Sequence, residues 1–279
     1  MPIMLPAALG PFRKFWPHLK PTLLYLAETE VHVYSFSVAA NILLSFFPFL
    51  IVVTSLVRYG LGWPGVEQGI YVALNDYFPG ETGRFLVRNL QSAVYTNGKA
   101  LSYFSMLLLL FTANGVFMPL EVALNRVWGI AKNRSFVSNQ VISQVLVFGV
   151  GLLWFATTAI ASPLARLGWL AVLGYKAISF PVTFLIVFLT YWLLPNARVP
   201  KPLIFLAALG VAAAIELVKL LNLLIWPWLY AKLSHEYGPF VNSVTILTWS
   251  FVFSLLFLAG AEWSARKARE LGAPALPHA

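Results

Sequence analysis

The chain has 279 residues, of which 59% are hydrophobic and only 10% are charged, and its mean hydropathy is +0.78. A soluble globular domain carries about 25% charged residues, so this composition excludes an ordinary soluble domain and predicts a membrane protein. The net charge of +9 comes from basic residues spread over short loops and tails, which is typical of membrane flanks that face anionic lipid and not of a nucleic-acid groove. With no cysteine, the sequence excludes a disulfide framework, a thiolate metal site and a cysteine nucleophile.

The N-terminal stretch PFRKFWPHLKPTLLYLAETE, residues 11–30, mixes aromatic with basic residues. This mixture predicts either a helix that lies in the inner membrane interface and is interrupted at Pro17 and Pro21, or an ordinary basic flank before the first span. Residues 1–30 contain no clean apolar core of a signal peptide, so we expect the first span to act as its own insertion signal.

Long apolar runs follow, and several reach the roughly 20 helical residues that cross a hydrocarbon layer of ~30 Å. Backbone groups in lipid must satisfy one another, and these runs are too long and unbroken for barrel strands, so they are predicted to be helices. The predicted spans cover residues 36–57, 101–120, 141–161, 178–194 with an extension toward Trp169, 202–226 and 244–263.

These runs predict an all-α fold, a polytopic membrane helix bundle with six transmembrane helices plus interfacial amphipathic helices. The chain is expected to form a single membrane domain, made of an interfacial segment (1–32), the six-span bundle (33–263) and a cytoplasmic tail (264–279). In the longest loop, VEQGIYVALNDYF and ETGRFLVRNLQSAV predict two amphipathic helices that cap the outer face and are separated at Pro79–Glu81.

The distribution of Lys and Arg sets the predicted orientation. If both termini lie in the cytoplasm, the inner segments hold eleven of the nineteen basic residues and the outer segments hold seven. This excess agrees with the positive-inside rule, and Arg266, Lys267 and Arg269 in the last tail are its clearest marker. We therefore expect a multi-pass protein with both termini in the cytoplasm.

The sequence offers little for catalysis or metal binding. None of its four histidines has a partner at metal-ligand spacing on a helix face, and no P-loop, GxGxxG or GxSxG motif is present. We therefore expect no enzyme activity, no catalytic residue, no metal and no cofactor. Membrane lipids, and not nucleic acid, are the expected partners.

Polar residues inside the predicted spans are the candidates for a binding site. In the second span, Asn114 precedes Gly115 and Pro119, which is typical of a helix that unwinds at a transporter site or of a tolerated proline kink. Asn41 in the first span is a candidate for the same site, or a source of interhelical hydrogen bonds worth about 1 kcal/mol each.

The stretch AAIELVKLLN, residues 213–222, places two charges within an apolar run. A charge at the centre of a transmembrane helix costs roughly 2.5–3.5 kcal/mol, so Glu216 is predicted to face the bundle interior, whereas Lys219 has a stem long enough to reach outward. Glu216, Lys219 and Asn222 recur every three residues along one side of the helix. Two interpretations stay open: an ion pair that neutralises itself, or a hydrated binding site in which Lys219 meets an anionic headgroup or metabolite.

A second polar group is predicted at the inner ends of the second and sixth spans. Its members are Glu121, Asn125, Arg126, Glu262 and Arg266. Carboxylates near the interface can reach water or a basic neighbour, so we expect this group to be structural first and to contribute to gating second.

Several short stretches share one order and spacing over residues 30–265. They are LLSFFPFL in the first span, LNRVWG after the second, LPNARVP after the fourth, IELVK in the fifth, Tyr237–Gly238, Trp249 and GAE at 260–262. Together they resemble the signatures of the YihY/BrkB family of bacterial inner-membrane proteins. The resemblance implies six helices in the inner membrane and cytoplasmic termini. Ala40–Asn41 departs from the aromatic pair that family members usually carry there.

The resemblance also frames the expected function. Members of the family have been linked to serum resistance and envelope physiology, and the family was once labelled ribonuclease BN. Ribonuclease chemistry needs a metal cluster or a His/Lys acid–base pair in a basic groove, which these residues do not supply. Polar residues at membrane depth favour a transporter or flippase-like protein for a lipid or an envelope metabolite, with an anionic lipid or small molecule as substrate. The alternative is a non-transporting scaffold of envelope integrity or assembly.

Overall fold

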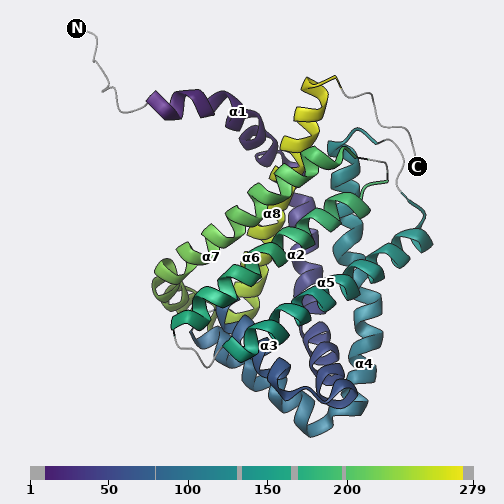
Figure 1. The fold of residues 1–279 in the computed structure, drawn as a ribbon, viewed down its shortest axis with the longest axis vertical. Helices are drawn as coiled ribbons and strands as arrows, with labels where there is room; N and C mark the ends of the chain where they lie inside the picture. The colour runs from purple at the N-terminus through teal and green to yellow at the C-terminus, as the bar shows by residue number, and fades with distance from the viewer. Residues whose placement is uncertain (1–9, 79, 131–133, 165–168, 197–198, 273–279) are drawn as a thin grey trace.

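The computed structural model describes residues 10–78, 80–130, 134–164, 169–196 and 199–272 (Figure 1). Within these ranges the chain is helical apart from short turns and contains no strand, so the predicted all-α class is confirmed. Its elements, in chain order, are α1 (Gly10–Leu26), α2 (Thr29–Ser55), the π-helical turn η2 (Leu56–Leu61), α3 (Pro64–Tyr77), α4 (Glu81–Val127), α5 (Phe136–Leu164), α6 (Trp169–Leu193), α7 (Lys201–Tyr237), the 3₁₀ turn η4 (Gly238–Phe240) and α8 (Val241–Glu270).

The long helices form one bundle in which α2 packs along α4 and α8. α7 packs against α8 and α6, α6 packs against α5, and α3 packs against α5 and α4. In Figure 1, α1, the start of α2 and the end of α8 meet at one end of the bundle, called here the terminal end, and α3 lies at the opposite, distal end.

Several helices are strongly apolar. Within the described ranges, the continuous helical stretches Thr29–Leu61 and Lys201–Glu270 are long and apolar enough to cross a membrane, and Val137–Gly151 and Ala177–Leu193 are shorter apolar helices. α7 also exposes large apolar side chains such as Leu224, of which 79% is accessible. Many exposed apolar side chains on one helix are typical of contact with lipid or with another protein.

Among the described residues, two large buried cores hold most of the helices together, and a small third cluster contains Phe78, Leu86 and Ile246. The larger lies toward the terminal end and includes Leu124, Tyr191, Leu194, Ile204 and Leu258. The smaller lies toward the distal end and joins the end of α2 and η2 to α3 and α4 through Leu50, Val57, Ile70, Leu90 and Val94.

α1 departs from its prediction. Pro17 and Pro21 lie inside this helix and do not interrupt it. They are four residues apart, so their missing N–H groups fall on the same side of the helix and the lost hydrogen bonds are confined to that side.

α4 departs from its prediction as well. The break at Pro79–Glu81 is observed, since α3 ends at Tyr77 and α4 begins at Glu81. The second amphipathic stretch, however, continues into the predicted second span as one helix of 47 residues. No proline precedes Pro119 in α4, and a single glycine costs a helix only about 1 kcal/mol, so nothing in the sequence stops it. The backbone is also helical from Asn114 through Pro119, and the local unwinding considered there is not observed.

The remaining helices lie over their predicted spans. α6 begins at Trp169, in agreement with the proposed extension of the fourth span. α7 continues past the predicted end at Trp226 and includes Pro227. α5 and α8 each extend a few residues beyond the apolar runs from which they were predicted.

Candidate functional site

α7 carries an ion pair inside the bundle. Lys219 Nζ lies 3.0 Å from Glu216 Oε1, and Ser179 of α6 donates a hydrogen bond of 3.2 Å to the same oxygen. Lys219 also donates to the Ser179 hydroxyl over 3.4 Å. Its Nζ lies 4.2 Å from the ring centre of Tyr77, the last residue of α3. Side chains from three helices therefore enclose the two opposite charges.

Both members of the pair face inward. The side chain of Lys219 is 2% exposed and that of Glu216 is 15% exposed. The inward position of Glu216 agrees with its prediction, and Lys219 does not use its stem to reach outward. Lys219 turns inward because a carboxylate, a hydroxyl and an aromatic face are all within its reach there, and each of them stabilises an ammonium group.

The same side of α7 continues with two polar groups that lack partners. Asn222 and Trp226 are each 4% exposed. Among the described residues, Asn222 Oδ1 and Trp226 Nε1 have no hydrogen-bond partner. The indole N–H faces the turn between α3 and α4, since a Cβ built on Gly80 would lie 3.2 Å from Trp226 Nε1. Gly80 also has a φ of +77°, which favours glycine at this turn.

A cavity of about 410 Å³ adjoins the ion pair. Apolar side chains from α2 through α8 line most of it. Three lining residues connect it to the pair: Tyr77, whose ring contacts Lys219; Ile215, which precedes Glu216; and Thr183, one helical turn after Ser179. The interior of the bundle thus combines an apolar chamber with a polar side of α7.

Asn41, another candidate, does not join this group. Asn41 Nδ2 donates to the Ser37 carbonyl over 2.9 Å. Its Oδ1 lies against Gly115 of α4, where an added Cβ would come within 2.0 Å of it. Asn41 therefore belongs to the close contact between α2 and α4. The side chain of Asn114 lies outside the described residues.

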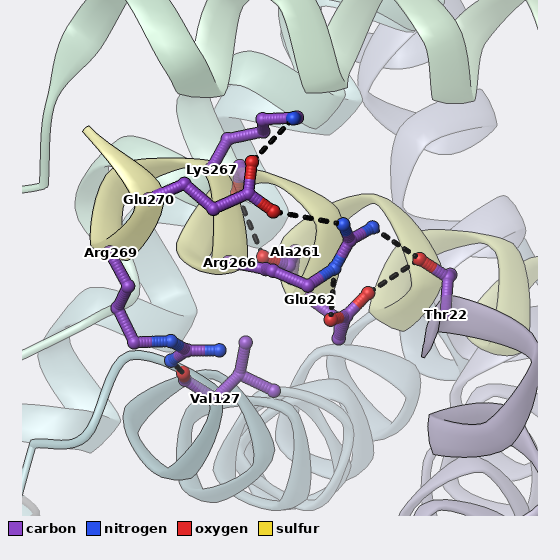
Figure 2. A network of polar contacts seen from close by, with 9 residues as sticks. Thr22, Val127, Ala261, Glu262, Arg266, Lys267, Arg269 and Glu270 are labelled. Atoms are coloured by element: carbon purple, nitrogen blue, oxygen red, sulfur yellow. Dashed lines mark hydrogen bonds and ion pairs between the residues drawn. The ribbon is translucent and has the colours of Figure 1, made fainter. Parts of the chain in front are cut away.

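At the terminal end, Glu262 and Arg266 of α8 hold α1 in place (Figure 2). Arg266 Nε lies 3.0 Å from Glu262 Oε1, Thr22 of α1 donates to Glu262 Oε2 over 2.5 Å, and Arg266 Nη2 donates back to Thr22 Oγ1 over 3.2 Å. Arg269 donates to the Val127 carbonyl at the end of α4 over 2.9 Å, which joins a third helix to the network.

Glu121 and Asn125 of α4 make a separate group. Asn125 Nδ2 donates to Glu121 Oε1 over 3.3 Å, and the Arg134 backbone N–H donates to the same oxygen over 3.0 Å. Asn125 Oδ1 accepts from the Asn196 N–H over 2.8 Å, so these side chains join the α4–α5 and α6–α7 connections. Arg126, the remaining member of the predicted group, instead pairs with Glu30 at the start of α2.

Sequence reasoning did not identify Arg134. Its guanidinium donates to three successive carbonyls, those of Leu193, Leu194 and Pro195, over 2.8–3.0 Å. Burial lowers the pKa of this guanidinium despite the nearby Glu121 charge. In the sequence Arg134 is one more basic loop residue, and only the LPNARVP connection, which its contacts reach, offered a signal.

A polar group at the distal end was also missed. Glu67 of α3 pairs with Arg58 at 3.2 Å and accepts hydrogen bonds from Tyr71 at 2.6 Å and Tyr95 at 2.7 Å. The Arg58 guanidinium also lies 3.8 Å from the ring centre of Tyr95. Burial alone would raise the Glu67 pKa, but the two tyrosine hydrogen bonds and Arg58 lower it below its ordinary value. This group holds η2, α3 and α4 together.

The polar residues inside the bundle have the types that bind ligands. In the part of the chain that the structure describes, no three His, Asp or Glu side chains come together in a way that could hold a metal ion. The interior side of α7 carries a positive charge, a negative charge and, as far as the described residues show, an acceptor and a donor without partners, and Ile215 on the same helix lines an apolar cavity. Such an arrangement suits a molecule with one polar and one apolar part.

Comparison with known proteins places the chain in a family. The family described as Virulence factor BrkB matches residues 24–278. The chain belongs to this BrkB family. A UPF0761 membrane protein of Acinetobacter baylyi is 25% identical over 227 residues, which cover 77% of this chain and 52% of that protein. A UPF0761 membrane protein of Chromohalobacter salexigens is 26% identical over 228 residues, which cover 78% and 55%.

These relatives support a membrane location for this BrkB-family chain, since both are named membrane proteins. The chain spans about half the length of the curated relatives it matches. No solved structure matches it. Three of the motif stretches that carried the resemblance contribute to the polar groups above: IELVK holds Glu216 and Lys219, LNRVWG holds Asn125, and GAE holds Glu262.

The glycine of GAE has a packing role of its own. A Cβ built on Gly260 would lie 2.3 Å from Val211 Cγ2 and 2.7 Å from the Tyr191 hydroxyl. α8 can therefore approach α6 and α7 closely at this point only because residue 260 has no side chain.

Proposed function

We propose that this BrkB-family chain is a bacterial inner-membrane transporter or flippase-like protein that moves a lipid or an envelope metabolite through the interior of its bundle. In this proposal α2, the second half of α4, α5, α6, α7 and α8 cross the bilayer, and both termini lie in the cytoplasm. The substrate has an anionic group that Lys219 binds, and Glu216 acts as the partner of that lysine.

One observation carries the proposal. A buried Lys–Glu pair contacts Tyr77, which lines an apolar cavity of about 410 Å³. Replacing a buried ion pair with apolar residues is often neutral or stabilising, so such a pair is weak evidence for a purely structural role. Ionisable residues at membrane depth commonly mark substrate or proton paths. The apolar lining of the cavity favours a lipid over a fully polar metabolite.

Lipid movement between leaflets tests the proposal. The purified full-length chain is placed in liposomes that contain a phospholipid labelled on its acyl chain, and dithionite, which does not cross the membrane, then quenches the outer leaflet. Liposomes without protein should lose about half of the signal. A chain that moves lipid should make nearly the whole signal quenchable.

The decisive variant combines Glu216→Gln with Lys219→Met, which leaves no unpaired charge. Its matched control combines Glu81→Gln with Arg84→Met, which removes another pair spaced three residues apart but exposed on the surface of α4. We expect the first variant to lose lipid movement and the control to keep it. If the wild-type chain and both variants left half of the signal protected, the scaffold alternative would be favoured instead.

A further inference from the structure

The interior side of α7 begins with an apolar residue that lines the cavity and continues with residues that carry polar atoms. Ile215, Lys219, Asn222 and Trp226 follow one another at spacings of three or four residues and so lie on one side. Ile215 lines the cavity, Lys219 lies next to the cavity-lining Tyr77, and Trp226 faces the α3–α4 turn. At 1.5 Å per residue, this side extends over roughly 16 Å.

The charges on this side cancel. Lys219 and Glu216 carry opposite charges, so their pair offers both a cationic and an anionic group to a ligand. A ligand that carries both a positive and a negative group adds no net charge. It can present its anionic group to the lysine and its cationic group to the glutamate.

Asn222 Oδ1 and Trp226 Nε1 also favour a ligand that carries both a cationic and an anionic group. Asn222 Oδ1 can only accept a hydrogen bond, and Trp226 Nε1 can only donate one. Ten buried side-chain atoms lack a partner among the described residues, and these two lie on the side of α7 that carries the ion pair. A headgroup that contains an ammonium N–H donor and a phosphate oxygen acceptor satisfies both atoms.

We propose that the cavity and the interior side of α7 form a binding site for a zwitterionic phospholipid, with an acyl chain in the cavity and a headgroup of phosphate and primary ammonium against Lys219, Glu216, Asn222 and Trp226. This inference rests on the proposed function and names its substrate class. The cavity volume of about 410 Å³ falls within the roughly 300–1,000 Å³ of typical ligand sites.

Lipid binding to the purified full-length chain, counted by native mass spectrometry, tests this site. The probes are phosphatidylethanolamine, phosphatidylcholine and phosphatidylglycerol with identical acyl chains. Phosphatidylcholine keeps the phosphate and the neutral charge but has no N–H donor, and phosphatidylglycerol has a net negative charge. We expect phosphatidylethanolamine to bind about ten-fold more tightly than either, as for one lost hydrogen bond to a charged group. Equal binding of the three lipids, or preference for phosphatidylglycerol, would overturn the proposal.

Two substitutions separate the parts of the headgroup. Asn222→Leu removes the acceptor and should abolish the preference for phosphatidylethanolamine over phosphatidylcholine. Trp226→Phe removes the donor but keeps an aromatic ring. It should weaken the binding of phosphatidylethanolamine and of phosphatidylcholine several-fold and leave the ratio of their affinities unchanged. Asn89→Leu, on the exposed side of α4, is the matched control and should change neither the affinities nor their ratio.

Asn222→Leu also has an outcome that contradicts the proposal. Removing a buried acceptor that has no partner is neutral or stabilising when the site has no ligand. A more stable variant with an unchanged lipid ratio would mean that the asparagine does not contact the headgroup. Free phosphoethanolamine, which has the headgroup but no acyl chain, tests the role of the cavity. If it displaced phosphatidylethanolamine at the same concentration as the lipid, the acyl chain would have no role in binding. Because binding is measured without transport, the absence of a preference for phosphatidylethanolamine in the wild-type chain refutes this site while the transport proposal stands, and the absence of lipid movement refutes the transport proposal while this site stands.

Discussion

Lys219 lies deeper in the protein than Glu216, the residue with which it pairs across 3.0 Å. The lysine side chain is 2% exposed and the glutamate side chain 15%. Lysine has the longer stem and would ordinarily extend toward the surface, so its position reflects the partners that it finds inside, Tyr77 and Ser179.

The first prediction concerns the stability of this pair. Glu216→Gln alone leaves the Lys219 ammonium buried without its carboxylate and should destabilise the protein by about 3–5 kcal/mol. The combination of Glu216→Gln with Lys219→Met leaves no unpaired charge and should be close to neutral. Thermal unfolding in detergent measures both. If the single variant were as stable as the double variant, the pair would contribute little to the packing of α7 against α6.

The second prediction concerns the contact of α2 with α4. Gly115→Ala would place a Cβ within 2.0 Å of Asn41 Oδ1 and 2.5 Å of its Cγ, so Asn41 must rotate and lose its bond to the Ser37 carbonyl. We expect a loss of about 1–3 kcal/mol in the free energy of unfolding.

Gly149→Ala in α5 provides the control, because nothing lies within 4 Å of the added Cβ. It should be neutral or stabilising by up to about 1 kcal/mol. Combining Gly115→Ala with Asn41→Ala should restore part of the lost stability. Absence of any rescue would show that the strain lies elsewhere.

Much of the helix layout could be predicted from the sequence, because long apolar runs and Pro79–Gly80 mark spans and a break directly. The continuity of α4 could not be predicted. The composition changes from amphipathic to apolar near residue 100, which indicated two helices, but no residue there stops a helix. The inward position of Glu216 followed from the cost of burying a charge. Its partner Ser179 and the nearby Tyr77 come from α6 and α3, and only the tertiary packing brings them to α7.

The third prediction concerns acid stability at the distal end. The pKa of Glu67 is lowered from its ordinary value of 4.5 because hydrogen bonds from Tyr71 and Tyr95 and the charge of Arg58 outweigh burial. Such a carboxyl stabilises the fold fully above its unfolded value, and this contribution is lost as the pH falls through the lower folded value. The melting temperature of the wild type should therefore fall more between about pH 6 and about pH 3 than that of Glu67→Gln. Parallel curves for the two proteins would contradict the assignment.

The fourth prediction concerns the attachment of α1. Thr22→Val removes the hydroxyl that donates to Glu262 and accepts from Arg266. With both bonds lost, α1 should separate more readily from α8, and limited proteolysis should cleave the Ala27–Glu28 turn several times faster. Thr96→Val, at an exposed position on α4, serves as the control and should leave the cleavage rate unchanged. Equal rates in Thr22→Val and the wild type would mean that apolar contacts alone hold α1.

The last prediction concerns the proposed topology. In the structure, Thr22 of α1 and Arg266 of α8 are in contact, so the two ends of the described chain share one end of the bundle. If that end lies in the cytoplasm, a reporter active only in the periplasm should be silent when fused after Leu271. The same reporter should be active when inserted after Gly62, in the short connection between η2 and α3. An insertion further along, within α4, would break that helix. Activity after Leu271 with silence after Gly62 would mean that the orientation is inverted. Five helices connect α3 to the C-terminal tail, and the two insertion points lie at opposite ends of the bundle. Equal activity at both places would therefore rule out the six-span arrangement.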